Sequence, residues 1–396
     1  MIKRCAASIL TVFFVMSIVF PAMALGRGNR GYRTPDGYNE HDYQKMLAFM
    51  ETEDPSGVKN GEKIAACFSG YYDPADPLTW SYYYYDHENA ILYLYGVFWS
   101  EEPDYRVAGL VLSEMGLVGG LDVSGCSELS SVSCDGNRFP YVNFAGCSSL
   151  YSVSCRNCTI QELDLSGCTG LEMIDCSGNL MEELDVSECS SAYDVECQDS
   201  MIETLDVSGC PGLVWLNCSG NDLTELDLSS NTSLEFLNCT GNGLTELDLT
   251  NNPLMSFDMI TAEGGGHVGY TNYGYIDDEG FWVNPDRAVA EPNGQNAFLG
   301  WYSEDGTFIA SGTELEAGST SYTRVKARFG AGVMGDADGN GTVDIPDALM
   351  VLRAAMGLIP VTAQMQSLCD VDGTPGIGIP DALKILRYAM GLISSL

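Results

Sequence analysis

Oxygen-bearing residues near the end of the chain have the spacing of a calcium-binding loop. Such loops place oxygen ligands at positions 1, 3, 5, 7 and 9, a glycine at position 6 and a carboxylate at position 12. Gly341 falls at position 6, residue 342 would offer its carbonyl, and residue 344 can act through a water. The predicted ligands of this first calcium site are Asp336, Asp338, Asn340, Thr342, Asp344 and Asp347.

A second loop on the same plan begins 34 residues later, at Asp370. Its predicted ligands are Asp370, Asp372, Thr374, Gly376 and Asp381. Thr374 replaces a carboxylate or amide, Pro375 stands where glycine is expected, and Gly378 has no side-chain oxygen for position 9. The sequence therefore predicts two Ca²⁺ sites, the second of which binds more weakly because fewer charged ligands hold the ion.

The segments that follow the two loops are nearly identical. Ile-Pro-Asp-Ala-Leu occurs at 345–349 and 379–383, Leu-Arg at 352–353 and 386–387, and Ala-Met-Gly-Leu-Ile at 355–359 and 389–393. A helix is predicted directly after the first loop, over residues 348–356. An ordinary EF-hand pair has a helix before each loop and a glutamate at position 12. Here both loops close with aspartate, and no helix precedes the first.

This duplicated loop and helix, at residues 332–396, resembles a type I dockerin, the module that binds cohesins on the scaffoldins of cellulosomes. The resemblance implies calcium-dependent attachment to a scaffoldin outside the cell, in two orientations related by a half-turn. Two cohesin-contacting positions that often hold small hydroxyl residues in this family are Ile-Pro in both repeats, which predicts a more apolar contact. The implied cohesin-binding residues are Ile345, Pro346, Leu349, Arg353, Ile379, Pro380, Leu383 and Arg387.

A 21-residue repeat dominates the chain ahead of this tail, over residues 107–258. One aliphatic column keeps the period without a slip: Leu121, Val142, Leu163, Leu184, Leu205, Leu226 and Leu247. A period of this length indicates a solenoid, in which each repeat buries its apolar face only against its neighbours. The unit LxxLxCxxNxL followed by LxxLDLxxN resembles the short bacterial variety of leucine-rich repeat. Its asparagine column is predicted to hydrogen-bond turn backbone inside the coil.

Fifteen cysteines in an exported chain would ordinarily indicate a disulfide framework, but most of them form two columns with the same 21-residue period. Stacked equivalents lie about 4.7–4.9 Å apart with parallel side chains, whereas a disulfide needs converging Cβ atoms about 3.5–4.5 Å apart. The columns are therefore predicted to be buried free thiols. The Cys155-Arg-Asn-Cys158 motif resembles a redox or zinc site. It is interpreted in the same way, because Cys158 replaces the asparagine found at 137, 179, 221 and 242.

Variable residues on the LxxLxC strands are predicted to point outward and to form a recognition surface, since aromatic anchors dominate binding energy at interfaces. The candidate residues are Tyr151, Met173, Tyr193, Trp215, Asn217, Phe236 and Asn238. Ordinary surface variation is the alternative. A second outward column, running from Asp122 to Asp248, is interpreted as a solvated face that discourages aggregation. Recruitment of cations or of a basic partner by this column is the alternative.

The first residues predict export. Lys3 and Arg4 precede an apolar run of about 16 residues, too short to span a bilayer, and Ala22-Met23-Ala24 offers a cleavage site, so residues 1–24 are predicted to be a secretory signal peptide. Residues 25–106 contain an amphipathic segment at 39–53 and a tyrosine-rich stretch. We expect them to cap the solenoid. A sugar-stacking platform built from the tyrosines and Trp80 is the alternative.

Residues 259–331 are predicted to form a small β domain, with a hairpin closed by Asp305-Gly306. The run from Phe298 to Tyr302 resembles the FxGWY motif of the bacterial β-repeat of internalin-type surface proteins, which implies a spacer or adhesive module. The spacer role is favoured. The chain is thus predicted to be multidomain: a β-rich leucine-rich-repeat solenoid, a small β domain and a small all-α calcium-binding dockerin.

Composition limits the function classes. The chain has 18 Lys and Arg against 55 Asp and Glu, a net charge of −37, which excludes nucleic acid as a partner. Its three histidines lie in separate segments and no catalytic motif occurs, so the protein is not expected to be an enzyme. We expect a secreted, non-catalytic protein on a scaffoldin or cell surface, whose solenoid recognises a protein or polysaccharide. The alternatives are a structural or adhesive spacer and a regulator or inhibitor of extracellular hydrolases.

Overall fold

The computed structural model of the protein describes most of the chain beyond Arg33. The described ranges are 34–86, 91–101, 104–255, 257–272, 275–276, 282–283, 286–293, 296–310, 312–316, 319–330, 333–338, 342–362, 365, 368–372 and 376–396. The predicted signal peptide and two predicted calcium ligands, Asn340 and Thr374, lie outside these residues. Among the described residues, no helix has both the length and the apolar character that crossing a bilayer requires.

The N-terminal region forms the first edge of the main sheet. Its elements are α1 (Glu40–Met50), α2 (Asn60–Cys67), the 3-10 turn η2 (Pro77–Trp80), β1 (Ser81–Asp86) and β2 (Ile91–Trp99). Strand β2 pairs antiparallel with β1 on one side and with β3 (Val107–Val111) on the other. Trp80 is fully buried and its Nε1 donates to the Asp73 carbonyl at 2.9 Å. This ring therefore packs in the core and cannot serve a sugar-stacking platform.

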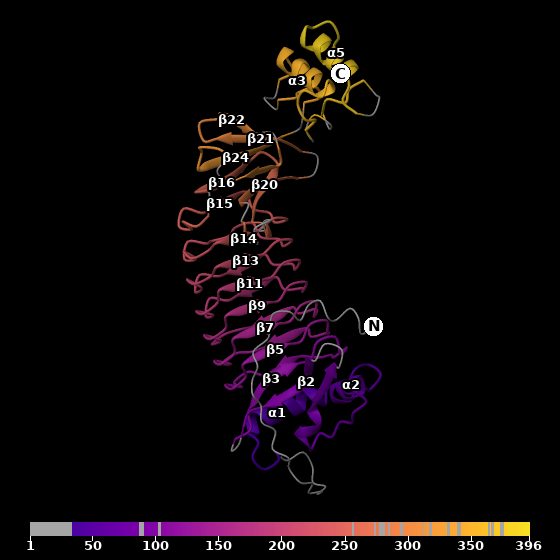
Figure 1. The fold of residues 1–396 in the computed structure, drawn as a ribbon, viewed down its shortest axis with the longest axis vertical. Helices are drawn as coiled ribbons and strands as arrows, with labels where there is room; N and C mark the ends of the chain where they lie inside the picture. Colours follow the sequence, from indigo (N-terminus) through magenta and orange to yellow (C-terminus); the bar gives the residue numbers. More distant parts are fainter. Residues whose placement is uncertain are drawn as a thin grey trace. The chain divides into compact units, whose positions relative to one another are not determined.

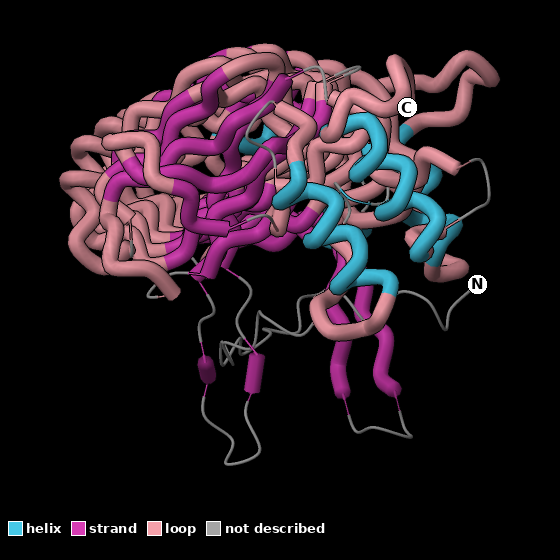
Figure 2. Tube along the Cα trace, turned by 90° about the horizontal axis from the view of Figure 1, so that it is seen from above, coloured by secondary structure: helices cyan, strands magenta, loops and turns pink. Residues whose placement is uncertain are grey.

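The solenoid coils contribute short parallel strands to a long nine-stranded sheet and to two smaller sheets, with turns and loops making up the rest of each coil (Figures 1 and 2). The nine-stranded sheet continues from β3 through β5 (Ser131–Ser133), β7 (Ser152–Ser154), β9 (Met173–Asp175), β11 (Asp194–Glu196), β13 (Trp215–Asn217) and β14 (Phe236–Asn238). The other half of the coils gives β4 (Leu121–Asp122), β6 (Tyr141–Asn143) and β8 (Glu162–Asp164), and separately β10 (Glu183–Asp185) and β12 (Thr204–Asp206). The parallel pairs from β5 to β14, and those among the strands of the other half of the coils, are in register at 21 residues, whereas β3 pairs with β5 at 22. The predicted β-solenoid is thus confirmed.

Buried asparagines join consecutive coils, as the repeat predicts. The Asn179 Nδ2 donates to the Cys155 carbonyl of the preceding coil at 2.9 Å and to the Cys176 carbonyl of its own coil at 2.7 Å. Its Oδ1 accepts the backbone N–H groups of Cys158 and Ile160, each at 3.0 Å. One side chain therefore satisfies four buried backbone groups that would otherwise be costly.

The cysteines of the described residues are all free thiols, and all but Cys67 are buried. Several donate hydrogen bonds to carbonyls one coil away, such as Cys168 Sγ to the Phe144 oxygen at 3.1 Å. Cys158 does the same from its asparagine position, donating to the Cys134 carbonyl at 3.1 Å. The columns hold the coils together as small buried side chains, in line with the prediction.

The acidic column from Asp122 to Asp248 has a structural role that the sequence interpretation missed. Each member accepts the backbone N–H of the residue two positions later, for example Asp164 Oδ1 from Ser166 at 3.0 Å and Asp227 Oδ1 from Ser229 at 2.9 Å. Such side chain-to-backbone bonds shape the turn that leaves each strand. A hydrogen bond from the Ser229 side chain, and then that from its backbone N–H, lower the pKa of the Asp227 carboxyl.

The β domain packs against the last coil of the solenoid. The last coil contributes β15 (Glu246–Asp248), and the strands of the domain are β16 (Met259–Glu263), β17 (Gly266–Asn272), β18 (Tyr275–Ile276), β19 (Trp282–Val283), β20 (Asp286–Pro292), β21 (Ala297–Ser303), β22 (Phe308–Ala310), β23 (Glu314–Glu316) and β24 (Arg324–Gly330). Cys239 N donates to the Tyr270 carbonyl of β17 at 3.1 Å, where the next coil would otherwise supply an acceptor. One continuous hydrophobic core includes both regions.

The C-terminal segment has a separate small core. Helices α3 (Ile345–Ala355) and α5 (Ile379–Ala389) pack together through Ala348, Val351 and Ile385. Helix α3 begins three residues before the predicted start at 348, because Pro346 is accommodated in a first turn and Asp347 accepts the backbone N–H of Asp344 at 2.7 Å.

Candidate functional site

The first candidate calcium loop brings three buried or half-buried carboxylates together. One oxygen from each of Asp336, Asp338 and Asp347 lies within 4.8 Å of the others. Asp347 Oδ1 accepts the backbone N–H groups of Ala337 and Asp338 at 2.8 and 3.1 Å. Through its other oxygen the same side chain starts α3. Loop and helix are therefore fixed by a single residue.

The first loop, residues 336–347, contains four aspartates and no Lys, Arg or His. Burial, with the nearby charge of Asp338, raises the pKa of Asp347 to about 6. Asp344, at loop position 9, has a buried Oδ1 without a hydrogen-bond partner. Converging carboxylates with an unpartnered buried oxygen fit a hard divalent cation such as Ca²⁺, which takes oxygen ligands. Thr342, the predicted carbonyl ligand, is exposed at position 7.

The second loop repeats this geometry. Asp370, Asp372 and Asp381 again place one oxygen each within 4.8 Å of one another. Asp381 Oδ1 accepts the N–H groups of Val371 and Asp372 at 2.8 and 2.9 Å, as Asp347 does in the first loop.

Two features distinguish the second loop. Asp370 Oδ2 accepts the Gly376 N–H at 2.9 Å, so the predicted ligand residue Gly376 is tied to the first carboxylate of its own loop. Lys384 Nζ donates to the Val371 carbonyl, whereas Met350 occupies the equivalent place in the first repeat. A cation beside a loop that has fewer carboxylates opposes Ca²⁺ binding, in keeping with a weaker second site.

The helices present matched exposed apolar residues. Ile345 and Ile379 are each 49% exposed, and Leu349 and Leu383 are 47% and 48% exposed. Two further exposed pairs, which were not predicted from the sequence, lie beyond the helix ends: Met356 with Met390 (50% and 49%) and Leu358 with Leu392 (68% and 67%). We name these four pairs the twinned apolar surface. The predicted contacts Pro346, Pro380, Arg353 and Arg387 are exposed too. Exposed apolar groups of this kind mark interaction sites.

The predicted recognition residues of the solenoid occupy three columns of the nine-stranded sheet. Met173, Trp215 and Phe236 share one column, and the rings of Trp215 and Phe236 stack with centroids 4.5 Å apart. Tyr151 and Tyr193 lie one position earlier in their coils, ahead of strands β7 and β11.

Asn217 and Asn238 have a structural task, which weakens their assignment as ligand contacts. Asn217 Oδ1 accepts the Ser219 hydroxyl at 2.8 Å, and Asn238 Oδ1 accepts the Thr240 hydroxyl at the same distance. Their side-chain oxygens shape the turns that follow β13 and β14.

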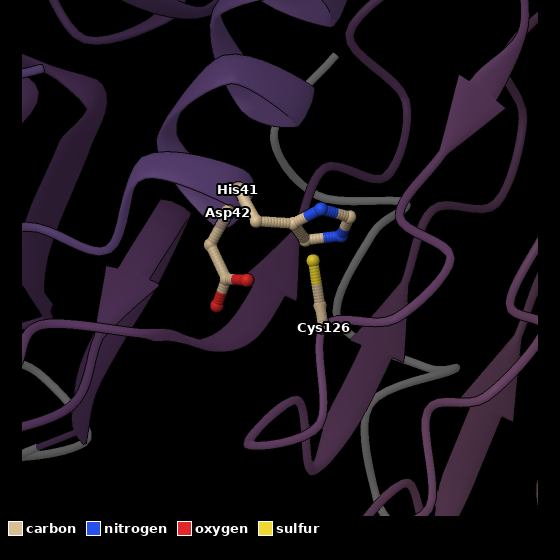
Figure 3. A group of neighbouring side chains, drawn as sticks. All are labelled: His41, Asp42 and Cys126. Atoms are coloured by element: carbon tan, nitrogen blue, oxygen red, sulfur yellow. The ribbon is translucent and has the colours of Figure 1, made fainter.

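A third group of potential ligands, His41, Asp42 and Cys126, was not foreseen from the sequence (Figure 3). Asp42 is fully buried, and both its oxygens are occupied by Arg106, at 2.8 and 3.0 Å. Burial and the charge of Asp42 raise the pKa of the Cys126 thiol. An adjacent guanidinium and a protonated thiol disfavour a metal ion, so this group fixes α1 to the first coil.

A scan against protein-family models matched none, and a search of the curated proteins also found no match. Among solved structures, one similar chain is described as the functional domain of InlJ from Listeria monocytogenes, which includes a cysteine ladder. It is 14% identical with a TM-score of 0.30, and the match covers 56% of this chain and 66% of that chain. The 21-residue strand register, independent of this likeness, identifies the protein as a β-solenoid.

Proposed function

We propose that the protein is a secreted, non-catalytic binding protein, anchored by a calcium-dependent dockerin tail to a cohesin of a scaffoldin, whose solenoid recognises a protein or polysaccharide. The observation that carries the anchoring role is the twinned apolar surface. Its four residue pairs have nearly equal exposure, and each set follows a loop of converging carboxylates. The proposal includes export by the N-terminal signal peptide.

Calcium, when bound, would neutralise the clustered carboxylates and hold each loop closed. Asp336, Asp338 and Asp347 would contribute ligands in the first loop, and Asp370, Asp372 and Asp381 in the second. Asp347 and Asp381 also start their helices, so closing the loop fixes the start of the helix that carries the apolar residues. This coupling makes partner binding dependent on the ion.

The matched exposures favour two equivalent binding orientations. Leu349 and Leu383 take corresponding places in the two repeats, and so do Arg353 and Arg387. A partner that covers one set of residues leaves the other set free. Loss of one set is therefore expected to cost little affinity, since the second orientation remains.

The test is binding of the purified chain to a panel of immobilised type I cohesins, with 2 mM Ca²⁺ or with EDTA. We expect at least one cohesin to bind in Ca²⁺ only. Leu349→Asp and Leu383→Asp should each reduce affinity by a few fold, and the double variant should abolish binding. Tyr322→Asp, at an exposed aromatic of the β domain, is the matched control. Binding that persists in EDTA, or no binding to any cohesin, would refute the anchoring role.

A further inference from the structure

The outer face of the nine-stranded sheet combines stacked rings with a carboxylate, Asp194, that has an unpartnered buried oxygen. Strand register places Met173, Asp194, Trp215 and Phe236 in one column, which we name the Trp215 column. The planes of the Trp215 and Phe236 rings differ by 29°, so the rings cover one another's faces. Asp194 is the neighbour of Trp215 on the other side, between that ring and the Met173 thioether.

Asp194 is poorly solvated where it lies. Its Oδ1 is buried and has no hydrogen-bond partner. Burial, and then the charges of Glu196 and Asp175, raise the pKa of the Asp194 carboxyl to about 6. An unpartnered, partly desolvated carboxylate costs stability, so its retention on a surface calls for an explanation.

The adjacent outward column supplies a second carboxylate. Asp175 has a cation nearby, because Arg156 Nε lies 3.4 Å from it, and it also accepts the Ser177 hydroxyl at 2.7 Å. Glu196 accepts the Gln198 amide at 3.4 Å, and its charge interacts with that of Arg156 without forming an ion pair. In the described part of the chain, neither Asp194 nor Glu196 forms an ion pair.

The chain has few means of neutralising these two groups itself. Between Asn157 and Gly266 the sequence contains 21 Asp and Glu and no Lys, Arg or His. A cation that pairs with Asp194 and Glu196 must therefore come from outside this stretch. A guanidinium suits the place, because it presents a planar fork of donors to carboxylates and also stacks on an indole ring.

We propose that the outer sheet face between β9 and β14 docks a basic polypeptide segment, with an arginine held by Asp194 and Glu196 against Trp215. This deepens the proposed function, on which it rests, by naming the partner class of the solenoid. A neutral polysaccharide fits less well, because it brings no positive charge to the buried, unpartnered oxygen of Asp194. Ca²⁺ fits less well too, because these carboxylates are not among the groups of described residues whose ligand atoms converge within 4.8 Å.

The experiment uses the full chain, in reducing buffer with 2 mM Ca²⁺ and 0.15 M NaCl. The probe is a fluorescein-labelled (Gly-Arg-Gly-Ser)₃ peptide, followed by anisotropy, beside a copy with citrulline in place of arginine. Asp194→Asn with Glu196→Gln should weaken binding about tenfold, through loss of charge-assisted contacts. The matched control, Glu203→Gln with Glu225→Gln, removes the same charge from exposed positions on the other half of the coils. It should change affinity by less than about twofold.

Several results would overturn the inference. These are no binding of the arginine peptide, equal losses in the two double variants, equal binding of the citrulline peptide, and displacement of the probe by 10 mM Ca²⁺ or by cellohexaose. Circular dichroism checks that the variants fold. Cohesin binding is measured in parallel. If the unmodified chain binds no cohesin, the anchoring proposal fails. If cohesin binding is unchanged but the two double variants lose the same peptide affinity, only the basic partner is rejected.

Discussion

Replacing Asn179 by alanine should unfold the solenoid at a markedly lower denaturant concentration. This side chain makes four buried hydrogen bonds to backbone groups of two coils, at 2.7 to 3.0 Å. A typical hydrogen bond contributes about 1 kcal/mol net, and a buried group left unpaired costs about 1–3 kcal/mol. The expected loss is therefore about 4 kcal/mol, a large share of the roughly 5–15 kcal/mol that stabilises most domains.

The chain supplies its own control for this substitution. Cys158 occupies the asparagine position one coil earlier, and its thiol donates to the Cys134 carbonyl. Asn179→Cys should keep a donor but lose the oxygen that accepts two backbone N–H groups. We expect about half the loss seen with alanine. Urea unfolding under reducing conditions, followed by far-ultraviolet circular dichroism, measures both variants. A loss below about 1 kcal/mol for alanine, or equal losses for the two variants, would contradict the ladder's role.

Three further predictions concern charge and sulfur. Lys384→Met should raise the Ca²⁺ affinity of the second loop by about threefold to tenfold, because it removes a nearby cation. Titration calorimetry measures this affinity, and either no change or a change at the first loop would contradict the prediction. The folded-state pKa of Asp194, about 6, lies above its ordinary value of 3.8, so the ionised carboxyl destabilises the folded protein at pH 7. This destabilisation disappears as the pH falls from 6 toward 4 and the carboxyl becomes protonated. Asp194→Asn should therefore add about 1 kcal/mol at pH 7, after a discount for solvent screening, and almost nothing at pH 4; calorimetric melting at both pH values checks this. With Ellman's reagent, Cys67 should react first in the native protein and the buried thiols only after denaturation, a pattern that several fast thiols would disprove.

Much of the solenoid could be predicted because its determinants repeat. The 21-residue period fixes which residues of adjacent coils are neighbours, so the bonds of Asn179 and the free thiols followed from spacing alone. The carboxylate loops were foreseen for a similar reason, since the positions of Asp336 and Asp347 along one short segment determine that they converge. The spacing of residues along the sequence is enough to predict contacts that are local or that repeat from coil to coil.

Other features depend on contacts that no spacing reveals. The pairing of Cys239 with Tyr270, which closes the last coil, joins residues of unrelated pattern. The turn-forming bonds of residues such as Asp164 escaped notice because a regular acidic column also fits a solvated face. The exposure of Met356 and Leu358 was missed because both lie beyond the end of the helix, where the apolar pattern no longer tells inside from outside.

Thiols and amides are interchangeable donors at one column of this fold. Cys210 Sγ donates to the carbonyls of Val186 and Cys189, and Asn231 Nδ2, one coil later, donates to the corresponding carbonyls of Val207 and Cys210. The number of oxidisable thiols in this scaffold can therefore be changed coil by coil. Successive cysteine-to-asparagine exchanges offer a route to an oxygen-tolerant version of the same scaffold, with the outer surface unaltered.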